Sequence, residues 1–367
     1  MVNTRVILVS FLLTLVVQFK QDNCCISGVK TGLGTGTGIT QKLQRSVPKR
    51  VPRILIKQGA FFLAGDKHGK VDIYDTTAKK IHSFDGNFTR RDGFAVGDIN
   101  GDGVEEIVIA HDGNHMIRVF NQQGVVISSF NGNFTSGDGL ATGDLDGDGK
   151  DEIIIAGDKH GMVDIFSQNG SKTGSFQAGF SSNDALTADD IVGDSRAEVI
   201  IHGDKHGAID IFNGTGGKIG SFKSGIHTQH RRDSMKTALG VGRNWDGIKV
   251  IVLAWAHEKY DGIGGFVNNV GLSVFDSSGK RLLYPSYEIH DSLPPIMARC
   301  NCCFTFGDRF KVRGSFLFCL GDRFDYLEIC DMRFLDSNLN FRRTGSFVLP
   351  LTEGDGFDVS RKHLPYQ

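Results

Sequence analysis

The chain has 367 residues, of which 48 are glycine and 7 are proline, and 41 Lys and Arg against 42 Asp and Glu give a formal net charge of -1. This balance excludes a bulk electrostatic attraction to nucleic acid or to an anionic membrane surface, so neither is an expected partner. The length would allow two average domains, but one repeat domain over residues 51–361 accounts for the sequence better.

The first 50 residues are predicted to lie outside that domain. Arg5 precedes a mostly apolar run over residues 6–17, which is short for a membrane span and typical of a signal peptide. We expect residues 1–27 to be a cleaved signal peptide and the chain to be secreted, with no membrane span after cleavage. The alternative is an uncleaved anchor that faces the lumen or the exterior. Residues 28–50, rich in Gly and Thr and then basic, predict a linker.

A repeat of 46 residues follows the linker. It is marked by phenylalanines at identical spacing, namely Phe84, Phe130, Phe176 and Phe222. Each period contains apolar runs of four to six residues, rich in Ile, Val and Phe and bounded by Gly, Asp and Asn. Such runs predict β-strands rather than helices. Four strands per period of this length predict the blade of a β-propeller.

The repeat is expected to extend over most of the chain. The predicted copies cover approximately residues 53–84, 93–130, 139–176, 185–222, 237–289 and 304–347. The first copy lacks a clear first strand, and residues 356–361 resemble one. We therefore expect an all-β propeller of four-stranded blades, about six in number with seven possible. The C-terminal strand would close the ring and remove two open sheet edges.

Two acidic loops lie between the first and second strands of their copies. Each places oxygen side chains at alternate positions and Gly at the sixth, a pattern typical of calcium loops. The expected ligands of the first loop are Asp98, Asn100, Asp102, the carbonyl of Val104, and Glu106. Those of the second loop are Asp144, Asp146, Asp148, the carbonyl of Lys150, and Glu152. The alternative is that these side chains only cap a turn.

A third acidic loop is a weaker candidate for metal. It keeps Asp190, Asp194 and Glu198, but Val192 replaces the oxygen at the third position and Ser195 replaces the glycine. Weak metal binding and none at all are both compatible with this pattern. In the fifth and sixth copies the acidic pattern is lost, so we expect no metal there.

The motif Gly-Asp-x-Asx-Gly-Asp-Gly followed by an Ile/Val-rich strand resembles the FG-GAP (VCBS-type) repeats of integrin α-chain propellers and of some fungal lectins. The complete motif occurs in the second and third copies, and the resemblance covers most of residues 51–361. It implies a propeller with structural calcium in its blade loops and an extracellular setting. Seven blades are usual in that family, and this chain departs from that number.

A second repeated motif joins the second and third strands of its copies. The pentad Gly-Asp-Lys-His-Gly is identical at residues 65–69, 157–161 and 203–207. It should lie on the opposite face of the ring from the acidic loops. One interpretation is a tight turn with solvated Lys and His. The other is a repeated polar site for sugar hydroxyls or an acidic partner, with these ligand-binding candidates: Asp66, His68, Asp158, His160, Asp204 and His206.

Four Asn-x-Ser/Thr sequons suit a secreted glycoprotein, at Asn87, Asn133, Asn169 and Asn213. The seven cysteines leave disulfide pairing open, and the spacing of Cys300, Cys302 and Cys303 argues against a zinc site.

The first functional hypothesis is a secreted, calcium-binding module, not an enzyme, that recognises a glycan or an extracellular protein. One alternative is an enzyme that acts on extracellular polysaccharides in the propeller funnel, although no nucleophile–base motif is evident. The other is a purely structural matrix or cell-wall protein. The sequence does not indicate an oligomeric state.

Overall fold

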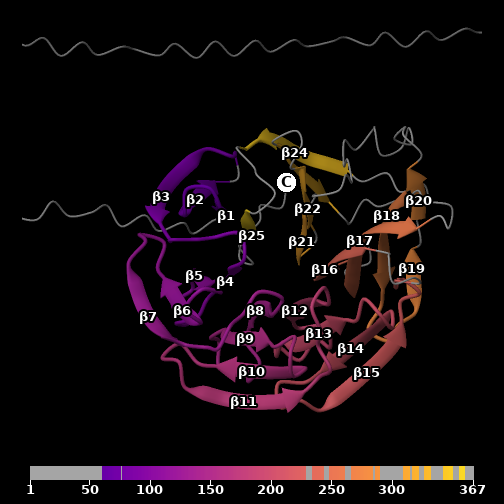
Figure 1. Cartoon of the computed structure of the whole chain (residues 1–367), viewed down its shortest axis with the longest axis horizontal. Coiled ribbons are helices and arrows are strands. Elements are labelled where there is room, and N and C mark those ends of the chain that lie inside the picture. Colours follow the sequence, from indigo (N-terminus) through magenta and orange to yellow (C-terminus); the bar gives the residue numbers. More distant parts are fainter. Residues whose placement is uncertain are drawn as a thin grey trace, which may run out of the picture. The chain divides into compact units, whose positions relative to one another are not determined.

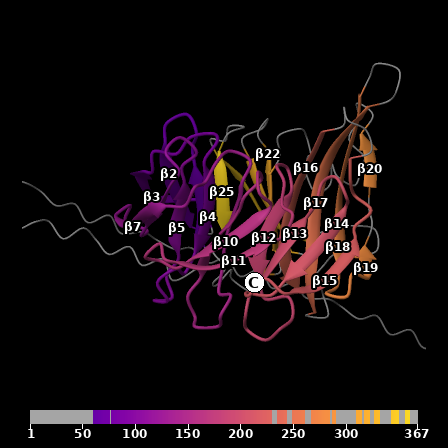
Figure 2. The ribbon, with the colours of Figure 1, turned by 60° about the horizontal axis from the view of Figure 1, so that its bottom comes forward.

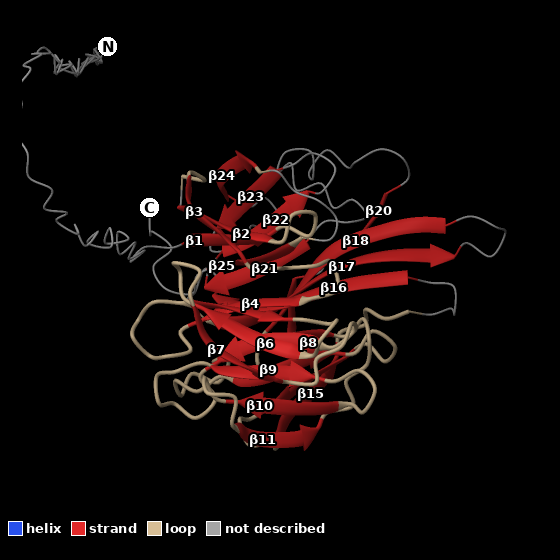
Figure 3. Ribbon diagram, turned by 60° about the vertical axis from the view of Figure 1, so that its left-hand side comes forward, coloured by secondary structure: helices blue, strands red, loops and turns tan. Residues whose placement is uncertain are grey.

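The computed structural model describes residues 60–75, 77–228, 234–243, 248–260, 266–283, 286–289, 309–314, 316–321, 326–331, 342–349 and 355–359. All of them belong to the second of two compact units, Pro52–Gln367. The signal peptide and linker predicted over residues 1–50 lie outside this part. Every described element is a β-strand (Figure 3). Among these residues, no helix is long and apolar enough to cross a membrane.

Four sheets have the predicted four-stranded antiparallel form. The first contains, in order, β25 (Gly356–Val359), β1 (Ala60–Ala64), β2 (Lys70–Asp75) and β3 (Lys80–Asp85). The second contains β4 (Gly93–Gly97), β5 (Glu106–Ala110), β6 (Met116–Phe120) and β7 (Val126–Asn131). The third contains β8 (Gly139–Gly143), β9 (Glu152–Ala156), β10 (Met162–Phe166) and β11 (Lys172–Gln177). The fourth contains β12 (Ala185–Asp189), β13 (Glu198–His202), β14 (Ala208–Phe212) and β15 (Lys218–Lys223).

The fifth sheet combines the last two predicted copies. It has nine strands: β16 (Ser234–Arg243), β17 (Lys249–Tyr260), β18 (Phe266–Phe275), β19 (Arg281–Leu283), β20 (Ser286–Ile289), β21 (Arg309–Gly314), β22 (Phe316–Gly321), β23 (Tyr326–Asp331) and β24 (Arg342–Val348). The expectation of about six separate blades was therefore wrong, since the described strands form five sheets. The first strands of the two copies, β16 and β21, pair in parallel at Val241↔Arg313 and Gly242↔Gly314, and this pairing fuses them.

The C-terminal strand completes the first sheet, as the sequence predicts. β25 pairs antiparallel with β1, from Phe61↔Val359 to Ala64↔Gly356. The buried Asp358 carboxylate also accepts the N–H of Val96 in β4 at 3.0 Å, which ties the completed sheet to the next one. The first strands of the repeats lie side by side in the order β25, β4, β8, β12, β16, β21 and back to β25 (Figures 1 and 2).

Phenylalanines at the 46-residue spacing hold consecutive sheets together. Each lies in the outermost strand of one sheet and contacts an aromatic ring in the third strand of the next. The centroid distances are 5.4 Å for Phe84–Phe120 and Phe130–Phe166, and 5.2 Å for Phe176–Phe212 and Phe222–Phe275. Such pairs stabilise a fold beyond the area that they bury.

Glycine turns cover the same phenylalanines. Gly170 has a φ of +81°, and a Cβ at this position would overlap the ring of Phe130 in the preceding sheet. Gly124, Gly216 and Gly279 meet Phe84, Phe176 and Phe222 in the same way. Glycine is required at these turns both by the backbone conformation and by the lack of space.

We predict that Gly170→Ala destabilises the propeller by about 2–4 kcal/mol, because it combines an unfavourable φ with an overlap against Phe130. The matched control is Gly179→Ala, where φ is +74° but no atom lies within 4 Å of the added Cβ. It should lose only about 1 kcal/mol. Urea unfolding of both variants measures the difference, and equal losses would contradict the packing role of the glycine.

Candidate functional site

The acidic loops lie where the sequence places them, between the first and second strands of their sheets. Carboxylates at the first position bond to the loop backbone, since Asp98 Oδ2 accepts the Gly103 N–H and Asp144 Oδ2 accepts the Gly149 N–H, both at 3.0 Å. Val104 and Lys150 are the residues whose carbonyl oxygens were expected to bind calcium. Their N–H groups donate hydrogen bonds to Asp102 Oδ1 at 2.8 Å and to Asp148 Oδ1 at 2.9 Å. Each loop is thus wrapped around its own acids.

The second loop has the donor set that best fits calcium. Carboxylate oxygens of Asp144, Asp146 and Glu152 all lie within 4.8 Å of one another, and no other described residues bring three such ligands together. Burial, together with the charges of Asp146 and Asp144, raises the pKa of Glu152 to about 7. A hard cation with oxygen ligands would relieve this repulsion.

The first loop is arranged differently around its closing acid. The amide nitrogen of Asn100 donates to Glu106 Oε1 at 2.8 Å, and Glu106 Oε2 accepts the N–H of Ile99 at 3.0 Å. Burial raises the pKa of Glu106 to about 8, with Asp102 and Asp98 adding to the shift. The amide side chain would have to rotate before its oxygen could bind a cation.

The third loop already contains a cation. The Lys249 ammonium lies 2.5 Å from Asp190 Oδ2, and Val192 at the third position is exposed. Although burial acts to raise the pKa of Asp190, the hydrogen bond from Lys249 lowers it overall. Asp194 Oδ1 accepts the N–H of Arg196 at 2.9 Å, and Glu198 Oε2 accepts the N–H of Ile191 at 3.0 Å. The ammonium group supplies the positive charge that a metal would bring.

The acidic loops also connect neighbouring sheets. The Asp151 N–H donates to the carbonyl of Asp98 at 2.8 Å, and 46 residues later Ala197 N–H donates to the carbonyl of Asp144 at 2.6 Å. The stem of Arg196 lies against Gly147 of the preceding loop. Each loop therefore contributes to the contact between two consecutive sheets.

The pentads form tight turns on the opposite side of the sheets. The backbone N–H of each pentad aspartate donates a hydrogen bond to the carboxylate of an aspartate that directly precedes the first strand of the same sheet. Asp66, Asp158 and Asp204 donate their N–H groups to Asp355, Asp138 and Asp184 at 2.8–2.9 Å. The side chains of His68, His160 and His206 are exposed, whereas Asp204 is buried. The histidines and lysines of the pentads are thus the groups that face solvent.

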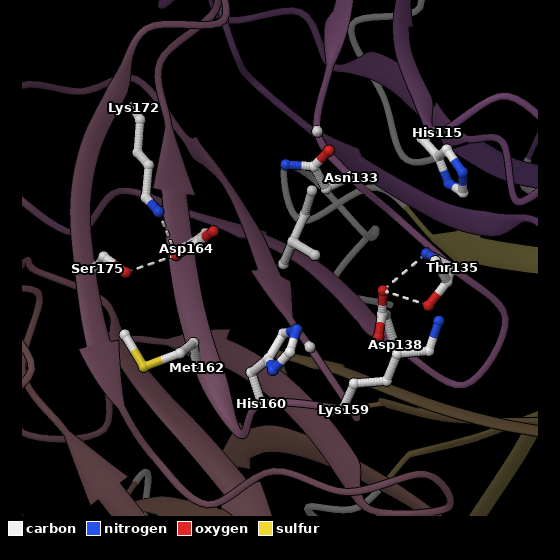
Figure 4. Close-up of a pocket in the computed structure, with 13 residues that line it drawn as sticks. His115, Asn133, Thr135, Asp138, Lys159, His160, Met162, Asp164, Lys172 and Ser175 are labelled. Carbon is white, nitrogen blue, oxygen red and sulfur yellow. Dashed lines mark hydrogen bonds and ion pairs between the residues drawn. The ribbon is translucent and has the colours of Figure 1, made fainter.

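One pentad lines a cavity of about 530 Å³ that also borders the second sheet (Figure 4). Lys159 and His160 come from the pentad, and Asp138 and Asn133 come from the connection between β7 and β8. A further wall consists of Asp164 with its partners, Lys172 at 2.7 Å and Ser175 at 2.6 Å. The cavity therefore offers both hydrogen-bond donors and acceptors.

His115 is a lining residue that the sequence analysis did not select. It occupies the place of Gly161 in the next copy and keeps the left-handed backbone, with a φ of 60° against 64° for the glycine. Its Nδ1–H donates to the carbonyl of Phe134 at 2.8 Å, which leaves Nε2 as the remaining polar ring atom. A non-glycine residue in this conformation is strained, and such strain is frequent at functional sites. The replacement of the repeat's glycine by histidine was the signal for it.

The four sequon asparagines fall into two groups. Asn87 and Asn133 are exposed, lie near the pentads and have left-handed backbones, with φ values of 52° and 54°. Asn169 and Asn213 cap turns with their Oδ1 atoms, which accept the N–H groups of Ser171 at 2.9 Å and Gly217 at 2.7 Å. Glycosylation itself remains a prediction. Of the cysteines, Cys319 and Cys330 lie in the paired strands β22 and β23, and the others lie outside the described residues.

The spacing, the loops and the sheets agree with a comparison of sequence families. The family model of the FG-GAP-like repeat matches residues 98–155, which contain both complete acidic loops. Residues 98–155 therefore carry an FG-GAP-like repeat, and the described sheets form a β-propeller. No curated protein sequence matches it.

Solved propellers resemble this chain only in outline. A lectin of Agrocybe aegerita that recognises non-reducing terminal N-acetylglucosamine has 13% identity and a TM-score of 0.47, over 83% of this chain and 95% of the lectin. A chain of a nidogen/laminin complex has 11% identity and a TM-score of 0.47, over 79% of this chain and 93% of that one. Similarities at this level carry no argument about what this chain binds.

A buried histidine precedes the pentad of the fourth sheet. His202 is fully buried, and its Nε2 lies 3.1 Å from both the Ser224 hydroxyl and the carbonyl of Ile226. Burial lowers the pKa of His202 from 6.5 to about 4. The residues 46 positions earlier are Ala156, Ala178 and Phe180, which form an apolar version of the same arrangement.

We predict that His202 makes the propeller less stable in acid. The unfolded chain binds a proton at this site below about pH 6.5 but the folded chain only near pH 4, so stability falls as the pH drops through this window. The loss at pH 4 should be roughly 3 kcal/mol. Urea unfolding at pH 7.5 and 4.5 should show a smaller loss for the variant His202→Ala, Ser224→Ala, Ile226→Phe. A variant that loses as much as the wild type would exclude this role.

Proposed function

We propose that this FG-GAP-like propeller is a binding module, not an enzyme, and that it recognises a polar ligand in the cavity lined by the pentad of the third sheet. The observation that carries the proposal is the convergence of His115, Lys159 and His160 with Asp138 around a cavity of about 530 Å³. Ligand sites are typically concave and combine a few well-placed polar groups with an apolar floor. Ile155 and Met162 supply apolar surface in this cavity.

A glycan is the ligand class that suits this cavity best. Sugar hydroxyls both donate and accept hydrogen bonds, so they need neighbouring groups of both kinds. Lys159 donates, the Nε2 atom of His115 accepts, and the Asp164 carboxylate accepts from Ser175 and Lys172. An extracellular protein that presents acidic side chains to Lys159 and His160 is the second possibility.

An extracellular location and structural calcium are further parts of the proposal. The sequons and the signal-like N-terminal segment favour secretion, although that segment lies outside the described residues. The three acids that lie close together in the second loop favour calcium there. The first loop has oxygen-bearing residues at the same positions, so the proposal includes it. Bound calcium would neutralise the carboxylates of loops that connect consecutive sheets, so its role would be stabilising.

We predict that the cavity variant Lys159→Ala, His160→Ala weakens binding to any glycan recognised on an array by at least about tenfold, through loss of a charged donor. The matched control is Lys205→Ala, His206→Ala in the identical pentad of the fourth sheet, which does not line this cavity. An equal loss of glycan binding in both variants would show that the ligand does not bind in this cavity. Absence of glycan binding by the wild type would exclude the glycan, and retained protein binding would then favour the second possibility.

We predict that millimolar calcium raises the melting temperature of the wild-type chain after chelator treatment, because metal bound only by the folded state stabilises it. Combined Asp98→Ala and Asp144→Ala substitution should abolish the rise. Asp190→Ala is the control, since Lys249 already neutralises that acid and the calcium response should persist. A melting temperature that calcium leaves unchanged in the wild type would refute the metal assignment.

A further inference from the structure

In the first, third and fourth sheets the outermost strand begins with a lysine, and in the fifth sheet β19 begins with Arg281. Lys80, Lys218 and Arg281 lie over aromatic rings of the adjacent strand, Tyr74, Phe212 and Phe275, at 5.2–5.7 Å. Lys80, Lys172 and Lys218 also form ion pairs with Asp72, Asp164 and Asp210, at 2.5–2.9 Å. A cation at this place protects a strand edge from pairing with other chains.

The second sheet lacks both halves of this arrangement. Val126 stands at the position of the lysine, and Arg118 stands at the position of the aspartate. Val125, Val126 and Ile127 are 57%, 47% and 37% exposed. Within the described part of the chain, Arg118 forms no ion pair. The charge of the aspartate position is therefore inverted, and the lysine is replaced by an apolar surface.

Arg118 and the apolar residue Val126 lie on the same face of the second sheet. Arg118 is opposite Ser129, and Phe120 is opposite Val126 because Ile127 forms a bulge in β7. Residues 118 and 120 alternate by two along β6, so their side chains share a face. β7 is the last strand of this sheet, so no strand among the described residues pairs with its outer edge. Apolar side chains, a cation and an available strand edge thus adjoin one another.

We propose that the β7 edge of the second sheet docks an extended segment of a partner protein whose side chains alternate between apolar and acidic residues. The segment would add a strand to the sheet through main-chain hydrogen bonds, as in other cases of strand addition. Its apolar side chains would cover Val126, and its carboxylates would pair with Arg118. This surface is separate from the cavity assigned to the polar ligand.

The charge favours a partner protein over a second copy of this chain. β7 (Val126–Asn131) contains no acidic residue, so pairing two copies of this strand would bring no carboxylate to Arg118. An acidic segment supplies one, whereas Arg118 would repel a basic segment. The positive charge of Arg118, at a position where the neighbouring sheets have aspartate, thus favours an acidic partner.

Peptide selection on the intact chain tests this proposal. Random octapeptides displayed on phage are panned against the immobilised wild type and against Arg118→Asp, Val126→Lys, a variant that restores the pattern of the neighbouring sheets. The wild type should enrich peptides with alternating apolar and acidic residues. A synthetic peptide of the enriched sequence should bind the variant at least about tenfold more weakly by calorimetry. Equal thermal melts of the two proteins establish that the variant is folded.

The fourth sheet provides the reverse experiment. Its outermost strand already has the exposed Ile219, so Asp210→Arg with Lys218→Val should create a second site and raise the peptide stoichiometry from one to two. Enriched peptides without acidic residues, equal binding to the Arg118→Asp, Val126→Lys variant, or a stoichiometry that stays at one would overturn the proposal. Self-association of the wild type that this variant abolishes would overturn it in favour of a second copy.

Discussion

The structure depends on a repeated contact between consecutive sheets. In the first four sheets, the phenylalanine of the outermost strand is enclosed by a third-strand aromatic ring and by a glycine turn of the next sheet, as Phe130 is by Phe166 and Gly170. This contact has to recur at the same place for each sheet to pack against the next. The 46-residue spacing of phenylalanine and glycine in the sequence follows from that requirement. Surface residues of the loops at either end of the sheets are freer to vary.

That freedom separates the two sides of the propeller. On one side, the acidic loops bond to the following sheet through Asp98 and Asp144, so their acids are part of the scaffold. On the other side, the pentad aspartates fix the turns and leave the lysines and histidines exposed. A repeat that keeps its core and changes single surface residues can give each sheet a different role, as His115 and Arg118 illustrate in the second.

Local patterns in the sequence predicted the strands, the acidic loops and the pentad turns, because each depends on residues within one period. The pairing of β25 with β1 spans the chain, but it was predictable because the first copy lacks a first strand and residues 356–361 resemble one. Three features could not be predicted in this way. The fusion of β16 with β21 depends on two strands about 70 residues apart that meet edge to edge. The Lys249–Asp190 pair joins two copies, and the cavity at His115 requires two sheets to be placed side by side.

The pairing of β25 with β1 has a consequence for biosynthesis. These strands are separated by about 290 residues, as shown by the bond between Asp66 and Asp355 with a sequence separation of 289. At ordinary rates of translation, roughly 15–60 s pass between the emergence of β1 and that of its partner. During this interval the apolar strand Ala60–Ala64 lacks its neighbour on one side. The nascent chain therefore exposes an unpaired strand edge that could pair with other chains. A chaperone or rapid packing against the second sheet would have to shield this edge until the chain is released from the ribosome.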